Sequence, residues 1–100
     1  MTDHPIQTFT ARWADIELLI SFERNWLGGD FIAHLQITSA EPHRAPLPIT
    51  ETGYLSHFCS AAVIDDAGGP VAYVSGWLDQ AAASPRWKAG EVSRRQMSLF

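Results

Sequence analysis

The sequence has little cysteine and no long apolar run, and each shortage excludes a class of protein. Its 100 residues contain one cysteine, Cys59, so an internal disulfide is excluded and a reducing compartment is favoured. No apolar run approaches the roughly 20 residues that a membrane-spanning helix needs. No charged-then-apolar leader opens the chain. We therefore expect a cytoplasmic protein with no membrane segment.

Positive charge is also scarce. Seven Lys and Arg against eleven Asp and Glu give a formal net charge of -4, whereas a protein that binds DNA unaided needs a basic face. We expect no direct sequence-specific contact with nucleic acid. Residues 1–84 hold three arginines and ten acids, a net charge of -7, and residues 85–100 hold four bases and one acid, a net charge of +3. The basic end either steers the chain toward an acidic partner or nearby DNA, or complements a helix dipole.

The remaining composition is that of a folded domain. Apolar residues make up 46% of the chain and charged residues 18%, which excludes a disordered protein. One hundred residues form one domain with a modest core, and we assign residues 1–95 to it. Large aromatic side chains are available for that core, namely Trp13, Trp26, Trp77 and Trp87.

Alternation of apolar and polar residues in the first half predicts strands. Residues 6–13, 16–23 and 31–38 each alternate with period two, which is typical of half-buried strands. Because the predicted connections are short, we expect neighbouring strands to pair antiparallel. The predicted turns are Ala14-Asp15 and Gly28-Gly29-Asp30.

The second half predicts helices. Residues 54–63 are apolar and form either a short fourth strand or a packed loop. Asp65 and Asp66 open a turn that leads into a helix over residues 71–83, whose apolar residues recur at helical spacing. Ser84-Pro85 predicts the start of a second helix that runs to about Arg95. The expected fold is α+β: a three- to four-stranded antiparallel meander followed by one or two C-terminal helices packed on one face.

Candidate chemistry is concentrated in the segment around Cys59. In a strand, His57 and Cys59 share a face, and a cysteine nucleophile needs such a nearby base and a lowered pKa. A lone cysteine among apolar residues is more often a small buried hydrophobe, so we predict no catalytic residue. The alternative is a small-molecule-binding module or small enzyme with a pocket lined by Tyr54, His57 and Cys59.

Metal and cofactor sites are not predicted. The four histidines are scattered, without the paired spacings that place two ligands on one element. Gly68-Gly69 precedes a predicted helix, but the lysine and the wider glycine pattern of a phosphate-binding loop are missing.

A proline-rich segment, residues 44–58, interrupts the predicted strands. Prolines with threonines and a glycine form a rigid loop, which either presents a binding surface or covers the edge of the sheet; we favour the covering role. The block resembles a recurring block in short uncharacterised proteobacterial proteins, some encoded near mobile-element genes, and the resemblance implies no activity. A homodimer through an unpaired sheet edge is a further option, compatible with an interaction protein and with a small enzyme or small-molecule binder.

The most specific pattern is the final pentapeptide, residues 96–100, which we treat as a linear motif separate from the domain. It reads Gln96-Met97-Ser98-Leu99-Phe100. It resembles the peptide with which bacterial polymerases, mismatch-repair proteins and initiation regulators dock on the replicative sliding clamp, Gln-Leu-(Ser/Asp)-Leu-Phe. Met97 is the one departure, and it preserves volume and apolarity.

The resemblance implies a partner, the bacterial sliding clamp, and not a fold or a reaction. Leu99 and Phe100 would be apolar anchors, Met97 an adaptable contact, and Gln96 a donor and acceptor at a pocket rim. The alternative is that Leu99 and Phe100 fold back onto the core of the chain. We therefore expect a non-enzymatic interaction protein that docks on the clamp and is accessory to replication, repair or mobile-element maintenance.

Overall fold

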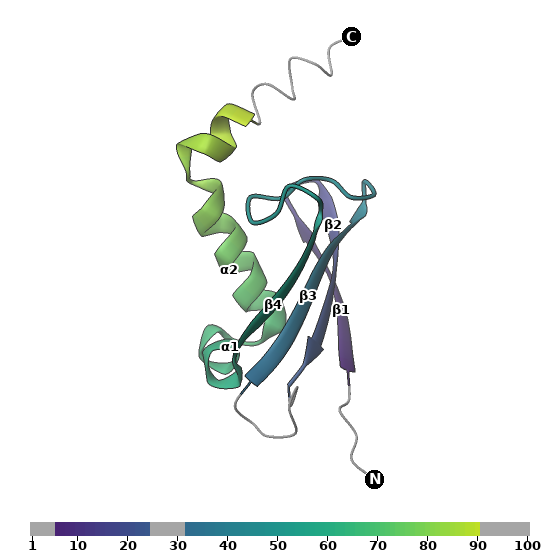
Figure 1. Cartoon of the computed structure of the whole chain (residues 1–100), viewed down its shortest axis with the longest axis vertical. Helices are drawn as coiled ribbons and strands as arrows, with labels where there is room; N and C mark the ends of the chain where they lie inside the picture. Colours follow the sequence, from purple (N-terminus) through teal and green to yellow (C-terminus); the bar gives the residue numbers. More distant parts are fainter. Residues whose placement is uncertain (1–5, 25–31, 91–100) are drawn as a thin grey trace.

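A four-stranded antiparallel sheet with helices on one face makes up the described part of the chain, residues 6–24 and 32–90, in the computed structural model (Figure 1). The strands lie in chain order across the sheet, so each one pairs with its sequence neighbour. They are β1 (Ile6–Trp13), β2 (Ile16–Glu23), β3 (Ile32–Glu41) and β4 (Tyr54–Ser60). The α+β fold class, the meander and the placement of the helices after the strands are confirmed.

The first hairpin follows from its two-residue turn. Trp13 pairs with Ile16, so Ala14 and Asp15 alone connect β1 to β2, as predicted. Ala14 has φ of 52°, in the left-handed region that short hairpin loops require. The pairing continues to Ile6 opposite Glu23.

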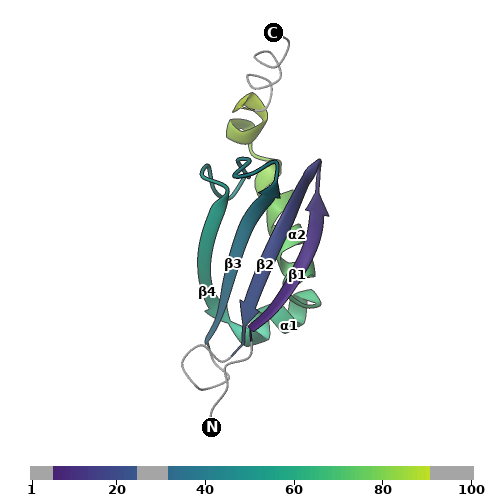
Figure 2. The ribbon, with the colours of Figure 1, turned by 90° about the vertical axis from the view of Figure 1, so that its right-hand side faces the viewer.

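Period-two alternation places one face of the sheet in the core. Leu18, Ile20 and Phe22 of β2 are buried, and so are Ala33, Leu35 and Ile37 of β3. These residues occupy alternate positions, as expected for a sheet with one face packed on helices and the other open. Figure 2 shows all four strands with the helices behind them. In β1, Phe9, Ala11 and Trp13 are partly buried and pack against this core.

The second layer consists of two helices, α1 (Ala61–Ala67) and α2 (Pro70–Ala82). Val74 and Leu78 of α2 are fully buried against the sheet, and α1 contributes Ala61 and Ile64. Pro70 stands in the first turn of α2, where the fixed φ of proline suits a helix. None of the described helices is long and apolar enough to cross a bilayer.

The prediction of one strand or packed loop for residues 54–63 needs a correction. Residues 54–60 form β4, and residues 61–63 begin α1. The Ser60 hydroxyl accepts a hydrogen bond from the Ala62 amide at 3.2 Å and caps the helix. Gly68, with φ of 106°, ends it. Seven residues are too few to show helical periodicity, so the apolar run reads as continuous strand.

The acidic pair is also placed differently from the prediction. Asp65 and Asp66 lie near the C-terminal end of α1, where the helix dipole disfavours negative charge. Arg24 compensates for this, because its guanidinium donates to both carboxylate oxygens of Asp65 at 2.9 and 2.5 Å. This hydrogen bonding lowers the pKa of Asp65.

The proline-rich connection from β3 to β4 closes the end of the sheet rather than covering its side edge (Figure 1). Ser39 anchors it: its amide donates to the Gly53 carbonyl at 2.8 Å, and its hydroxyl donates to the Ala45 carbonyl at 2.6 Å. Leu47 is buried in the core, with a tight turn between Leu47 and Thr50. The loop is therefore part of the packed body.

Residues 85–90 are helical and are separated from α2 by Ala83 and Ser84. The Ser84 hydroxyl accepts a hydrogen bond from the Trp87 amide at 3.2 Å, so the predicted cap is confirmed. The rest of the predicted helix, residues 91–95, lies outside the described residues.

Candidate functional site

The residues proposed to contact a partner, Gln96, Met97, Leu99 and Phe100, lie outside the described residues. Within the described residues, the candidate sites are clusters of side chains and hollows of the surface. The three residues of the predicted alternative pocket, Tyr54, His57 and Cys59, all lie on β4.

Strand parity separates these three residues. His57 and Cys59 are half-buried on the face that packs against α2, whereas Tyr54 is exposed on the open face. Tyr54 contacts Arg44 instead, whose guanidinium carbon lies 5.9 Å from the centre of the Tyr54 ring. The structure thus brings together two of the three predicted pocket residues and excludes Tyr54.

Tyr73 of α2 completes the cluster around His57. Its hydroxyl lies 3.2 Å from His57 Nε2 and also hydrogen-bonds Cys59. The His57 ring lies 4.6 Å from the ring of Trp77, at an angle of 51°. Because Tyr73 and Trp77 are four residues apart, one helix face delivers both to β4.

The protonation states of this cluster argue against nucleophilic chemistry. Burial raises the pKa of the Cys59 thiol, although the hydrogen bond with Tyr73 opposes the shift. Burial also lowers the pKa of His57 and raises that of Tyr73. At neutral pH all three side chains are therefore uncharged, and the thiolate that attacks a substrate is disfavoured. The cluster is suited to hold an uncharged molecule rather than to react with one.

A hollow of about 700 Å³ adjoins this cluster. It is lined by one residue of β4 and by the outer side of the helical layer: His57, Ala67, Ala72, Tyr73, Gly76, Trp77 and Gln80. We call it the α2 hollow. Tyr73, Gly76 and Gln80 were not predicted as site residues, although their spacing marks a second stripe along α2 beside its buried one.

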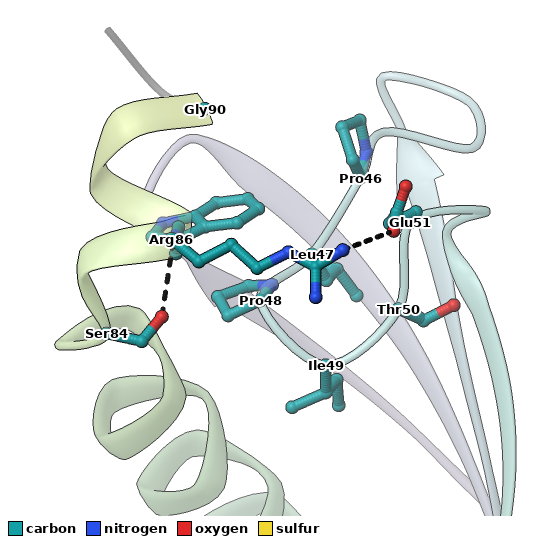
Figure 3. A pocket seen from close by; sticks show the side chains of 10 residues that line it. Pro46, Leu47, Pro48, Ile49, Thr50, Glu51, Ser84, Arg86 and Gly90 are labelled. Carbon is teal, nitrogen blue, oxygen red and sulfur yellow. Dashed lines mark hydrogen bonds and ion pairs between the residues drawn. The ribbon is translucent and has the colours of Figure 1, made fainter.

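A second hollow, of about 610 Å³, lies between the proline-rich loop and the helical segment after α2 (Figure 3). Pro46, Pro48 and Ile49 form one side, and Arg86 and Trp87 the other. Arg86 and Glu51 approach each other across it, with 3.6 Å between Nη2 and Oε2. Both side chains are almost fully exposed, so this ion pair adds little stability.

The open face of the sheet carries apolar side chains that reach solvent. His34 is the buried polar residue there, and it stacks on Phe58 at 4.4 Å and lies 2.6 Å from the Ser56 hydroxyl. The exposed apolar residues of this face are Ile6, Leu19, Ile32, Tyr54 and Phe58. Within residues 6–24 and 32–90, no three His, Cys, Asp or Glu side chains gather where they could hold a metal ion.

A family model described as KlcB third domain matches residues 6–87. The chain belongs to this family. The match spans β1 to α2 and continues into the next helical segment, so the KlcB third domain includes every residue of the α2 hollow and ends before residues 96–100. The description names no activity, ligand or partner. No curated protein and no solved structure matches the chain.

Proposed function

We propose that this protein is a non-enzymatic interaction module that docks on the bacterial DNA sliding clamp through residues 96–100. The observation that carries the proposal is the sequence Gln96-Met97-Ser98-Leu99-Phe100, which keeps four of the five consensus positions and replaces leucine by methionine. Such docking makes the protein accessory to replication, repair or mobile-element maintenance, and places it in the cytoplasm.

The body is compatible with a presenting role. The described residues pack a continuous core between sheet and helices, and the segment 85–90 leads the chain beyond the end of the sheet where the proline-rich loop lies (Figure 1). The sequence from residue 85 onward carries a net charge of +3. A basic segment beside the motif would speed association with an acidic surface, and this effect would weaken with salt.

Isothermal titration with a purified bacterial sliding clamp tests the proposal. We expect the intact chain to bind with a Kd of about 1–100 μM, because a short peptide offers few anchors. The double change Leu99→Ala and Phe100→Ala removes both apolar anchors and should weaken binding at least about tenfold.

Met97→Leu is the matched control within the motif. It restores the consensus residue at similar volume and should bind as well as the natural chain or better. Equal binding by the intact chain and by a chain that ends at residue 95 would overturn the proposal.

A further inference from the structure

Gly76 leaves open space in the α2 hollow, and the fold does not require glycine at this position. It stands at an exposed position inside α2, and a Cβ built on it meets no described atom within 4 Å apart from its chain neighbours and the adjoining helix backbone. Glycine inside a helix costs about 0.5–1 kcal/mol relative to alanine, and here neither packing nor backbone conformation compensates for that cost. A glycine that the fold does not need is typical of a place where a ligand approaches the backbone.

The walls around Gly76 are aromatic and set at different angles. Trp77 lies 4.6 Å from His57 and 6.0 Å from Tyr73 between ring centres, with planes tilted by 51° and 59°. Tilted rings present both edges and faces, which is the arrangement that flat aromatic molecules pack against. The volume of about 700 Å³ falls in the range of small-molecule sites.

The lining is also uncharged. Among the residues that the structure describes, the lining contains no Asp, Glu, Lys or Arg, and the lowered pKa of His57 keeps its imidazole neutral near pH 7. A charged ligand would lose its hydration without gaining a counter-charge. Hydrogen bonding is nevertheless available, because Gln80 lines the hollow and its amide both donates and accepts.

We propose that the α2 hollow is a binding site for a small, uncharged aromatic molecule that carries a hydrogen-bonding group. The ring packs against Trp77 over the open backbone at Gly76, and the polar group pairs with Gln80. This activity goes beyond clamp docking and uses none of residues 96–100.

Amide NMR titration of the full chain with benzamide tests the proposal, with benzoate and cyclohexanecarboxamide as matched probes. Benzoate has the same ring with a negative charge, and cyclohexanecarboxamide keeps the amide without the aromatic ring. We expect benzamide to produce saturable shifts at residues 57, 73, 76 and 77, with a Kd of about 1 mM for so small a molecule. Both other probes should bind at least about tenfold more weakly. Equal binding by all three, or no saturable shift, would overturn the proposal.

Gly76→Leu fills the hollow at a position where a helix favours leucine. Benzamide affinity should fall at least about tenfold while the circular dichroism spectrum and Tm are maintained. Ala62→Leu adds the same side chain at an exposed position of α1, away from the hollow, and should leave the affinity unchanged.

If Gly76→Leu does not fold, Gly76→Ala replaces it, and a melting temperature above that of the natural chain with a several-fold weaker affinity is the expected result. Unchanged benzamide binding in either folded variant would contradict the site. Leu99→Ala with Phe100→Ala should not alter benzamide binding, so failure of this site and failure of clamp docking give different results.

Discussion

The fold requires glycine at residue 53 but does not require glycine at residue 76. Gly53 has φ of 77°, and a Cβ there would lie 2.6–2.8 Å from backbone atoms of Arg44. Gly76 is helical, and apart from its chain neighbours and the adjoining helix backbone no described atom lies within 4 Å of a Cβ built there. The fold therefore demands glycine at the first position and merely tolerates it at the second. The fold thus explains why residue 53 is glycine, but it does not explain why residue 76 is glycine.

The surroundings of the two glycines differ in the same way. Near Gly53, Ser39 is fully buried and hydrogen-bonds three loop residues, Gly53, Ala45 and Arg44. Near Gly76, uncharged aromatic groups border open space. The proline-rich loop is thus fixed by its own contacts, whereas the α2 hollow has room for a second molecule.

The largest expected effect is that of Gly53→Ala. The new methyl group would overlap the Arg44 backbone, and alanine disfavours this φ, so the free energy of unfolding should fall by about 2–4 kcal/mol. Urea denaturation of the purified variant measures this. The same change at Gly76 should raise the free energy of unfolding by about 0.5–1 kcal/mol. Equal losses at the two positions would refute the contrast.

A smaller loss is expected for Ser39→Ala. The change removes the 2.6 Å hydrogen bond to the Ala45 carbonyl, and the free energy of unfolding should fall by about 1–2 kcal/mol. Thermal denaturation measures the loss. Ser75→Ala, at a partly exposed position of α2, is the control and should change stability by less than about 0.5 kcal/mol. Similar effects of both variants would show that the loop is not anchored through Ser39.

The smallest effect concerns pH and His57. Burial lowers its pKa below 6.5 in the folded chain, so at mildly acidic pH the unfolded chain binds more protons than the folded one. The contribution of His57 is therefore complete above pH 6.5 and is lost as pH falls from 6.5 toward the folded pKa. Cys59 and Tyr73 face it from β4 and α2, and neither is charged in this range.

Urea midpoints of the natural chain and of His57→Gln, measured between pH 7.5 and 5, isolate this contribution from the other histidines. The difference in stability between the two proteins should shrink as pH falls. A growing difference would mean that protonated His57 stabilises the fold.

Strand periodicity made most of the sheet predictable, because burial of one face forces apolar residues to recur every second position. The same rule correctly placed His57 and Cys59 on one face. The same rule places Tyr54, three positions before His57, on the opposite face. A single pocket lined by Tyr54, His57 and Cys59 does not agree with this alternation. Helix α1 was not predicted because its first four residues, 61–64, continue the apolar run of β4 and the helix has only seven residues.

The α2 hollow could not be predicted from sequence to the same degree. Its residues come from β4, the end of α1 and α2, and only the packing of the layers brings His57 to Trp77. Gly76 is visible in the sequence as a glycine within a helical pattern, but the open space beside it appears only when neighbouring elements are in place.

The order of the strands in space repeats their order along the chain, and this has a consequence for biosynthesis. Each new strand finds its partner in the segment translated just before it, so the sheet can grow hairpin by hairpin as the polypeptide leaves the ribosome. Pairing of β1, β2 and β3 needs no residue beyond Glu41, whereas burial of their apolar face needs the helices that are translated later.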